Sequence, residues 1–141
     1  NLYGTSFADD LRGDGSNNSL WGAAGDDVLY GRAGNDSLFG MGNNDTIYGQ
    51  GGNDTIWGGA GVDQFMFENG FGNDRIMDFD VTNTGEKINL SSILAINDYL
   101  DLDANHLQQS GRNAMIYDGA GNTITLIDVN VSELTVDHFV F

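Results

Sequence analysis

The sequence repeats with a period of nine residues from Gly4 to Met66. Written in nines, the chain forms seven rows that align without a gap: GTSFADDLR, GDGSNNSLW, GAAGDDVLY, GRAGNDSLF, GMGNNDTIY, GQGGNDTIW and GGAGVDQFM. The first position of each row is glycine: Gly4, Gly13, Gly22, Gly31, Gly40, Gly49 and Gly58. The eighth position is always apolar: Leu11, Leu20, Leu29, Leu38, Ile47, Ile56 and Phe65. A fixed period of this kind indicates a stacked repeat architecture.

The glycine-rich composition of the rows is also typical of flexible linkers and disordered segments. Disorder, however, gives no reason for one large apolar residue to recur at the same position in seven successive rows. The register of the repeat therefore favours an ordered structure.

Each row divides into a short apolar segment and a longer glycine-rich segment. Three residues, polar or small, then apolar, then aromatic, are too few for a helical turn but suffice for a strand whose middle side chain points inward. The glycine-rich residues then turn the chain, because glycine adopts positive φ without a steric penalty. Two rows would make one coil, so that strands two rows apart lie side by side in two parallel sheets. The sequence thus predicts an all-β fold, a right-handed parallel β-roll of short strands.

The predicted coils bury little apolar surface. Each coil supplies only two position-eight side chains, whereas ordering the backbone costs about 1 to 2 kcal/mol per residue. Position six carries a carboxylate in six of the seven rows, Asp9, Asp27, Asp36, Asp45, Asp54 and Asp63, and the amide of Asn18 in the other. Because stacked carboxylates repel one another, we expect a further interaction to hold the turns together.

The net charge indicates what that interaction is. Asp and Glu number 21 against five Lys and Arg, a formal net charge of −16. Such an excess repels nucleic acid and anionic membranes. The chain has no cysteine for a disulfide or thiolate site, and no apolar stretch approaches the ~18 residues that span a bilayer. We therefore expect a cation as the partner, with no nucleic acid and no membrane insertion.

The chain has the length of one domain, or of part of a larger protein. Its first residue is Asn1 rather than Met, so we expect a piece of a longer chain. The opening stretch NLYGTSFADD lacks the basic and apolar regions of a cleaved secretory signal.

Paired carboxylates and turn carbonyls from two stacked turns would form an all-oxygen cage. Such a cage suits a hard cation that takes six or more oxygens at flexible distances, which favours calcium over zinc, copper and magnesium. Folding and calcium binding would then be a single equilibrium.

The rows GRAGNDSLF, GMGNNDTIY and GQGGNDTIW resemble the G-G-x-G-x-D-x-U-x nonapeptide of RTX (repeats-in-toxin) proteins, a calcium-binding parallel β-helix signature. In that family one turn provides the carbonyls of positions two and four and the position-six carboxylate. The turn two rows on provides the carbonyls of positions one and three and its own carboxylate. Five such pairings fit the seven rows, which implies about five calcium ions. The resemblance implies metal-binding roles for Thr5, Phe7, Asp9, Asp14, Ser16, Asn18, Gly22, Ala23, Ala24, Gly25, Asp27, Gly31, Arg32, Ala33, Gly34, Asp36, Gly40, Met41, Gly42, Asn43, Asp45, Gly49, Gln50, Gly51, Gly52, Asp54, Gly58, Ala60, Asp63 and Asp74.

The first two rows depart from the family pattern. Phe7 and Ser16 replace the position-four glycine, and Asn18 replaces an aspartate. We expect these rows to bind calcium most weakly and to act as a frayed cap.

Residues 67–141 are expected to cover the open end of the roll (1–66). The stretch NGFGNDRIM (69–77) is an eighth row displaced by two residues, whose Asp74 would allow a sixth cage with Asp54. The sequence predicts strands over 74–80 and 86–94, a short helix over 97–107 and a hairpin across Asp118 to Asn122. This segment also resembles the C-terminal cap of RTX proteins, as in serralysin-type proteases and mannuronan epimerase R-modules.

The C-terminus of RTX proteins carries an uncleaved signal for type I secretion, often an acidic residue followed by hydrophobic ones. The last residues, DHFVF, fit this description, and they equally fit a last strand or helix that packs on the cap. The resemblance implies a secreted protein that stays loose in the calcium-poor cytosol and folds on calcium outside.

Nothing in the sequence favours catalysis. His106 and His138 have no partner at a spacing typical of metal or nucleophilic sites, and no G-x-S-x-G, H-E-x-x-H or P-loop motif occurs. We expect a non-catalytic module.

Position nine supplies two columns that point outward from the sheets. One column contains Trp21, Phe39 and Trp57, and the other contains Arg12, Tyr30, Tyr48 and Met66. These columns could pack across the strands, dock an upstream domain of the same protein, or bind a glycan such as alginate. Ice binding, known among RTX adhesins, would need a regular Thr array, and position three contains none.

The sequence therefore predicts a calcium-binding RTX module of a secreted bacterial protein. It would fold on calcium and would support type I secretion and the stability of an attached domain. The alternative is a carbohydrate-binding or adhesion module that uses the outward aromatic columns.

Overall fold

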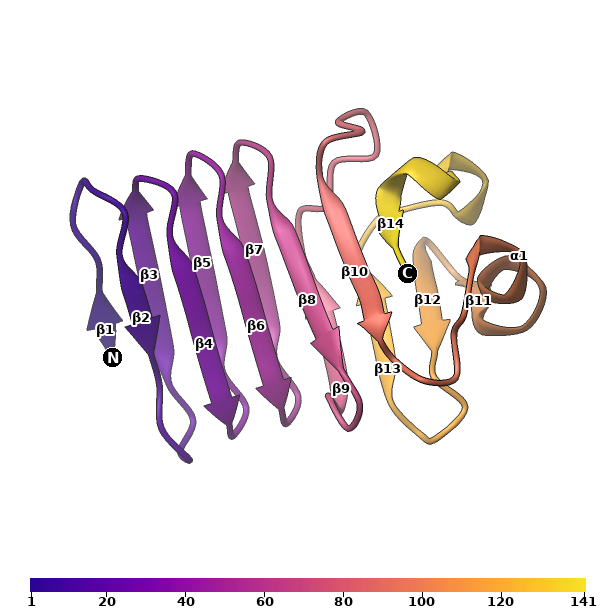
Figure 1. Ribbon diagram of the computed structural model, residues 1–141, viewed down its shortest axis with the longest axis horizontal. Coiled ribbons are helices and arrows are strands. Elements are labelled where there is room, and N and C mark those ends of the chain that lie inside the picture. Colours follow the sequence, from indigo (N-terminus) through magenta and orange to yellow (C-terminus); the bar gives the residue numbers. More distant parts are fainter.

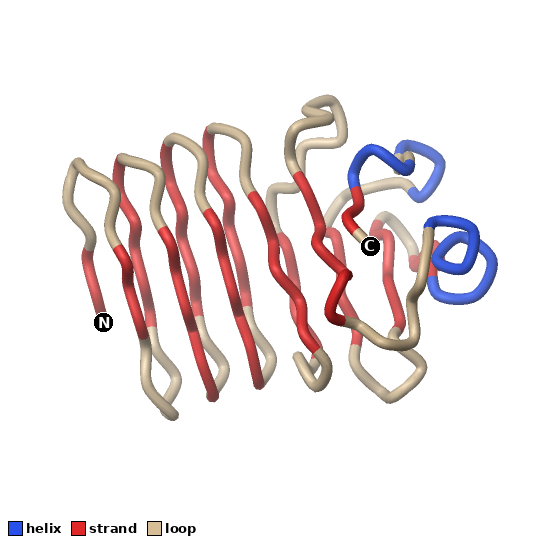
Figure 2. The backbone as a smooth tube through the Cα atoms, viewed as in Figure 1, coloured by secondary structure: helices blue, strands red, loops and turns tan.

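A computed structural model describes all residues, 1–141, as a flattened solenoid of two sheets (Figure 1). The eight-stranded sheet has the order β1 (Leu2–Tyr3), β3 (Ser19–Ala24), β5 (Ser37–Gly42), β7 (Thr55–Ala60), β9 (Asn73–Ile76), β13 (Thr123–Leu126), β12 (Asn113–Tyr117) and β11 (Leu107–Ser110). The six-stranded sheet has the order β14 (Phe139–Val140), β10 (Lys87–Ser92), β8 (Gln64–Glu68), β6 (Thr46–Gly51), β4 (Val28–Ala33) and β2 (Asp10–Arg12). Successive strands of the repeats alternate between the sheets, and short turns join them along two edges (Figure 2).

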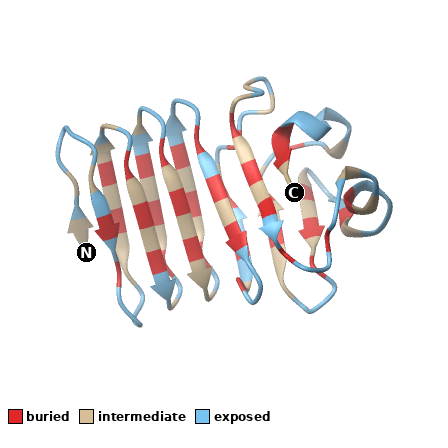
Figure 3. Ribbon diagram, viewed as in Figure 1, coloured by how far each residue is buried: buried red, intermediate tan, exposed pale blue.

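The strands pair in the register that the period predicts. β3, β5 and β7 are parallel, with Leu20 opposite Leu38 and Leu38 opposite Ile56. The same spacing places Leu29 opposite Ile47 in the six-stranded sheet. Position-eight side chains are buried, and in β3 to β7 they alternate with half-buried neighbours (Figure 3). The prediction of a parallel β-solenoid is confirmed.

The strands are longer than the three residues predicted. β3 to β7 each contain six residues, because positions one to three of the following row continue the strand. Ala23 pairs with Met41 and Ala24 with Gly42 on the far side of the position-one glycine. The glycine permits this continuation: a Cβ on Gly31 would lie 2.8 Å from the carbonyl oxygen of Gly49 in the next coil. The turns are therefore shorter than we expected.

Residues beyond the repeats extend both sheets. β9 adds to the eight-stranded sheet and β10 to the six-stranded sheet, each in parallel. The predicted hairpin is present as antiparallel β12 and β13, and β13 then pairs in parallel with β9. β11, which we did not predict, pairs antiparallel with β12. The repeats and the tail thus share continuous sheets.

The short helix predicted over 97–107 is present. It begins as α1 (Tyr99–Asp101), with Asp98 accepting a hydrogen bond from the backbone N–H of Asp101, and continues as a π-helical turn, Leu102–His106. Two 3-10 turns, Val131–Glu133 and Val136–His138, lead into β14, which pairs with β10. No helix here is long and apolar enough to cross a membrane.

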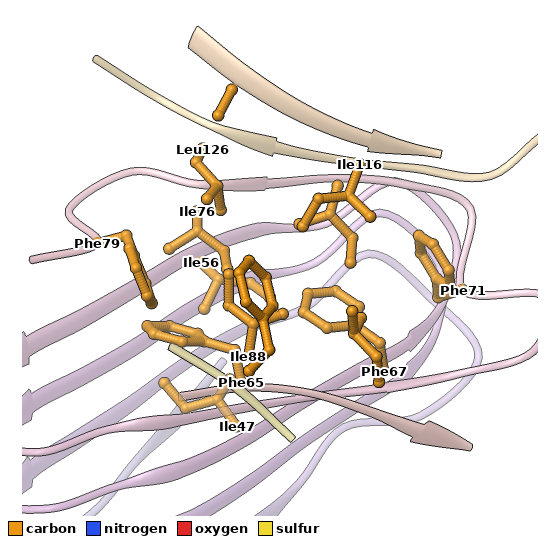
Figure 4. Packing of buried hydrophobic residues seen from close by; sticks show 14 of the residues in the cluster. Ile47, Ile56, Phe65, Phe67, Phe71, Ile76, Phe79, Ile88, Ile116 and Leu126 are labelled. Atoms are coloured by element: carbon orange, nitrogen blue, oxygen red, sulfur yellow. The ribbon is translucent and has the colours of Figure 1, made fainter. Parts of the chain in front are cut away.

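The core changes character where the repeats meet the tail. Aliphatic side chains fill the repeat region, whereas aromatic rings gather at the junction (Figure 4). Phe67 packs edge-on against Phe71 at 5.3 Å, and Phe65 lies 6.0 Å from Phe79, measured between ring centroids. One cluster of 24 buried residues connects the repeats with the tail. The larger side chains thus lie where the tail leaves the nine-residue period.

We expect Leu38→Ala to lower the free energy of unfolding by roughly 2 to 5 kcal/mol, because it leaves a cavity in a fully buried column. Ser37→Ala is the matched control, since Ser37 precedes Leu38 in the same strand and is half-buried. Its effect should stay within about 0.5 kcal/mol. Urea denaturation in one buffer measures both variants, and equal effects would contradict the assigned register.

Candidate metal centres

The position-six residues line the two edges of the solenoid. One edge, here the first edge, carries Asp9, Asp27, Asp45 and Asp63, and the second edge carries Asn18, Asp36, Asp54 and Asp74. On both edges the carboxylates from Asp27 to Asp74 are almost fully buried, with at most 2% of each residue exposed. Buried carboxylates in an unbroken column require compensation for their charge.

One oxygen of each carboxylate is held by the neighbouring turn. On the first edge, the backbone N–H of Asp27 donates to Oδ1 of Asp45, and that of Asp45 donates to Oδ1 of Asp63, both at 2.9 Å. On the second edge, the N–H of Asp36 donates to Oδ1 of Asp54 at 2.8 Å. This ladder fixes each carboxyl group, so the direction of its second oxygen is also fixed.

The second oxygen, Oδ2, has no hydrogen-bond partner in five of these residues. They are Asp27, Asp36, Asp45, Asp54 and Asp74. Leaving a buried acceptor unpaired costs free energy, so each such oxygen indicates a missing partner.

A backbone carbonyl lies beside three of these unpaired oxygens. A Cβ on Gly31 would lie 2.5 Å from Oδ2 of Asp36 and 2.8 Å from the carbonyl oxygen of Gly49, so both oxygens approach one point. Gly22 is flanked in the same way by Oδ2 of Asp27 and the carbonyl of Gly40, and Gly40 by Oδ2 of Asp45 and the carbonyl of Gly58. The repeating unit is thus a carboxylate oxygen and a position-one carbonyl between successive turns.

The backbone of these turns takes a special conformation. Positions two and four have positive φ in rows three to seven: Ala23, Gly25, Arg32, Gly34, Met41, Asn43, Gln50, Gly52, Gly59 and Gly61. Non-glycine residues rarely adopt this region, and the strain is typical of functional turns. Position-four carbonyls face the next turn on the same edge, because a Cβ on Gly52 would collide with the carbonyl oxygen of Gly34.

The first two rows are built differently. The backbone N–H and Oγ1 of Thr5 donate to Oδ2 of Asp9 at 2.6 and 2.9 Å, and the N–H of Asp14 donates to Oδ1 of Asn18 at 2.7 Å. None of Thr5, Phe7, Asp14 and Ser16 has positive φ. The carbonyls of Gly22 and Gly31 lie beside the position-six oxygens here as in the later rows, but hydrogen-bond donors from the same turn already bind these oxygens.

The last gaps on the two edges also differ from the regular ones. The two extra residues before row eight remove the position-one carbonyl beside Oδ2 of Asp54, although the N–H of Asp54 still donates to Oδ1 of Asp74. Above Asp63, the carboxylate of Asp78 accepts hydrogen bonds from the N–H groups of Gly58 and Gly59 at 3.0 Å. Direct hydrogen bonds therefore end the first edge.

Burial raises the pKa of the central carboxylates. Desolvation raises the pKa of Asp45 and Asp54 to about 7 and that of Asp74 to about 8, although a backbone hydrogen bond opposes each shift. The pKa values of Asp27, Asp36 and Asp63 are raised for the same reason. Without a compensating charge, these carboxyl groups therefore keep their protons to a higher pH than ordinary carboxyl groups do.

The donor set fits a hard cation. The chain contains no group of three or more His, Cys, Asp or Glu side chains that could hold a metal ion. A site between two turns can therefore draw on the two position-six carboxylates and on backbone carbonyls. All-oxygen donors with two carboxylates suit calcium, which accepts many oxygens at flexible distances.

A second polar column beside the carboxylates escaped our sequence analysis. Position five is Asn or Asp in six of eight rows: Asn17, Asp26, Asn35, Asn44, Asn53 and Asn73. Five of these side chains accept a hydrogen bond from the turn two rows on, and Asn73 accepts one from the hydroxyl of Thr123 instead. The recurrence of Asn and Asp at one phase was a signal that could have revealed them.

The outward aromatic residues form stacked columns. Tyr3, Trp21, Phe39 and Trp57 stack face to face, with centroids 4.5 to 5.4 Å apart. Tyr30 stacks on Tyr48 at 4.7 Å, with the Arg12 guanidinium over its ring. Both faces of the rings of Trp21 and Phe39 are covered by neighbouring rings, so only ring edges face outward. This arrangement favours cross-strand packing.

Neither histidine hydrogen-bonds to a position-six carboxylate. His106 Nδ1 contacts the carbonyl of Tyr117 in the tail. His138 is buried, accepts a hydrogen bond from the N–H of Thr135, and lies 3.2 Å from the carbonyl of Val81. Backbone hydrogen bonds thus engage both rings.

In metal-free solution we expect the fold to be more stable in acid than at alkaline pH. The raised pKa values mean that the folded chain binds protons more tightly than the unfolded chain. The stabilisation is fully present below about pH 4 and is lost as pH rises through the folded pKa values of about 7 to 8.

Urea denaturation with chelator at about pH 4.5 and 6 measures this dependence, and circular dichroism without urea measures the folded fraction at about pH 8, where we expect it to be small. Asp54→Asn should flatten it, because the amide does not titrate in this range, whereas Asp103→Asn, at an exposed position, should leave it unchanged. Stability that rises with pH in the wild-type chain would refute the interpretation.

The comparisons with known proteins agree with this geometry. The chain matches the family described as RTX calcium-binding nonapeptide repeat (4 copies) at residues 3–38 and 39–76, just over half of its length. Among solved structures, the extracellular lipase LipA from Serratia marcescens is similar in fold, with a TM-score of 0.77 and 23% identity over 94% of this chain and 20% of the lipase. The chain thus spans about a fifth of the length of that lipase.

Two subunits of the Azotobacter vinelandii mannuronan C5-epimerase are also similar. The AlgE6R3 subunit has a TM-score of 0.47 and 28% identity, over 98% of this chain and 80% of the subunit. The AlgE6R2 subunit has a TM-score of 0.48 and 25% identity, over 99% and 91%. No sequence among the curated proteins matches the chain.

The matched residues include all seven position-one glycines and every position-six side chain described above, and RTX repeats bind calcium. The chain belongs to the family of RTX calcium-binding nonapeptide repeats.

Proposed function

We propose that this chain is a non-catalytic module of a secreted bacterial protein that folds when calcium fills the gaps between successive turns. The observation that carries the proposal is the set of buried, unpaired Oδ2 atoms on both edges, each fixed by the Oδ1 ladder. Bound calcium would supply the positive charge that these carboxylates lack. The chain's own part is to hold the oxygens in place and to exclude water from them.

The gaps between successive turns differ in the oxygen ligands that they offer to an ion. Three gaps combine an unpaired carboxylate oxygen with a position-one carbonyl: Asp27–Asp45, Asp36–Asp54 and Asp45–Asp63. The Asp54–Asp74 gap has the unpaired oxygens without that carbonyl. The two gaps of the first rows are closed by hydrogen bonds. We therefore propose three strong sites, a fourth weaker one, and a cap formed by rows one and two.

Export is the second part of the proposal. The net charge of −16 would oppose folding of the repeats while calcium is scarce, and ions outside the cell would reverse this. Type I exporters would then handle a loosely folded chain, and the folded roll would stabilise an attached upstream domain. Support comes from membership of the RTX family and from the fold shared with an extracellular lipase.

The aromatic columns support packing more than glycan binding. Sugars stack on the faces of aromatic rings, and inside the Tyr3–Trp57 column neighbouring rings cover those faces. The exposed ring of Tyr3 ends the column with one free face. A carbohydrate-binding role therefore has no specific observation in its favour.

We expect calcium to fold the metal-free chain at about pH 8, where the carboxylates of the unfolded chain are ionised and their burial is unfavourable. Circular dichroism during a calcium titration measures the transition, with magnesium as the control cation. Magnesium should be much less effective, because it dehydrates reluctantly and demands near-octahedral geometry. A fully folded chain after exhaustive chelation at this pH would refute the proposal.

Two variants locate the ions in the same titration. Asp45→Asn should raise the calcium concentration at the midpoint by about tenfold or more, since Asp45 lies in two gaps. Even the loss of a residue that only hydrogen-bonds to a metal ligand lowers metal affinity by about tenfold. Asp9→Asn should behave nearly as wild type, because Thr5 already binds its Oδ2. Equal midpoints for the two variants would contradict the assignment of sites.

The export proposal has its own test. A passenger protein fused ahead of residues 1–141 should reach the medium of cells that carry a type I exporter. The same fusion without residues 135–141 should stay inside the cells. Secretion of both fusions would show that the C-terminal residues serve the fold alone, as strand β14 does.

A further inference from the structure

The position-five column makes a ladder of its own. Oδ1 of Asn17 accepts a hydrogen bond from the N–H of Asn35 at 2.8 Å, and Oδ1 of Asn35 accepts one from the N–H of Asn53 at 2.8 Å. On the first edge, Oδ1 of Asp26 accepts from the N–H of Asn44 at 3.0 Å. Each side chain therefore binds the turn two rows closer to the C-terminus, opposite in direction to the carboxylate ladder.

The donor in each of these bonds belongs to a peptide group that also carries a position-four carbonyl. In a planar trans peptide the N–H and C=O point in opposite directions. Drawing the position-five N–H back toward the preceding turn thus directs the position-four C=O toward the following turn. The structure shows this orientation, since a Cβ on Gly52 would collide with the carbonyl of Gly34, and one on Gly61 with that of Asn43.

These carbonyls enter the same gaps as the unpaired carboxylate oxygens. The carbonyl of Gly34 and Oδ2 of Asp36 both lie between the turn 31–36 and the turn 49–54. We infer that the position-five side chains are positioning residues for calcium, which aim the position-four carbonyl of the turn two rows on into its gap. This inference rests on the proposed function.

Each position-five side chain acts on a gap that its own turn does not line. Asn17, in row two, supports the carbonyl of Gly34 and hence the gap between Asp36 and Asp54. Asp26 supports Asn43 and hence the gap between Asp45 and Asp63, one coil away from its own carboxylate neighbour. Each substitution should weaken a site with which the substituted residue shares no turn.

One strong site lacks this support. The gap between Asp27 and Asp45 would use the carbonyl of Gly25, whose peptide ends in the N–H of Asp26. The position-five residue two rows earlier is Ala8, which has no acceptor, and the N–H of Asp26 has no partner in the structure. A substitution at Ala8 can therefore add the acceptor that this site lacks.

The test measures calcium dissociation constants of the 141-residue chain by competition with a chelator. We expect Asn17→Ala to weaken one site by about tenfold, as is usual for outer-shell partners of a metal ligand. Asn17→Asp keeps the acceptor oxygen and should restore most of the affinity. Wild-type affinity in Asn17→Ala, or equal losses in both variants, would overturn the inference.

A double-variant cycle separates positioning from general stabilisation. In an Asp36→Asn background, Asn17→Ala should cause little further loss of calcium affinity, because both changes act on one gap. In an Asp27→Asn background, which damages a gap on the other edge, the full loss should remain. Equal losses in both backgrounds would show a merely structural hydrogen bond and overturn the inference.

Ala8→Asn supplies the missing acceptor and should tighten calcium binding, by up to about tenfold. Ala8→Leu, which adds bulk without an acceptor, is the control and should show no gain. Binding that is unchanged by both Asn17→Ala and Ala8→Asn would overturn this inference alone. A wild-type chain that binds no calcium would overturn the proposed function with it.

Discussion

The structure depends on carboxylates that are buried in columns without a matching positive charge. Asp45 shows the problem most clearly: one oxygen accepts the N–H of Asp27, while the other is buried and has no partner. Burial raises the pKa of Asp45 to about 7, because the site has no positive charge that would stabilise the ionised carboxylate. Each coil adds another such group on each edge, while it adds only two position-eight side chains to the core. A fold with this balance is governed by what binds at its edges.

The glycines follow from the same constraint. Oxygens of successive turns can approach one another only if no side chain lies between them, and a Cβ on Gly31 would occupy the point that Oδ2 of Asp36 and the carbonyl of Gly49 approach. Position one must therefore be glycine in every regular row. Position two needs positive φ rather than space, which is why Arg32 and Met41 are tolerated there at the cost of some strain.

The nine-residue period predicted the parts of the structure that repeat. The stacking of Leu20 on Leu38 follows from the period alone, and so does the assignment of carboxylates to two edges. The six-residue strands were missed because pairing beyond the position-one glycine depends on contacts between coils. The direct hydrogen bonds of Asp78 above Gly58, and the parallel pairing of β13 with β9, were missed because they bring together segments that share no periodic pattern.

Two ladders of opposite direction explain how a turn without regular backbone pairing keeps its shape. In row four, the N–H of Asn35 donates back to Asn17 and the next N–H, that of Asp36, donates forward to Asp54. Successive peptide groups are thereby held from both sides, and the carbonyl between Gly34 and Asn35 is left facing the gap. Because both hydrogen bonds link different coils, an error in one turn is transmitted along its own edge. Order at each gap therefore depends on the turns on either side of it, which makes each edge of the roll a single physical unit.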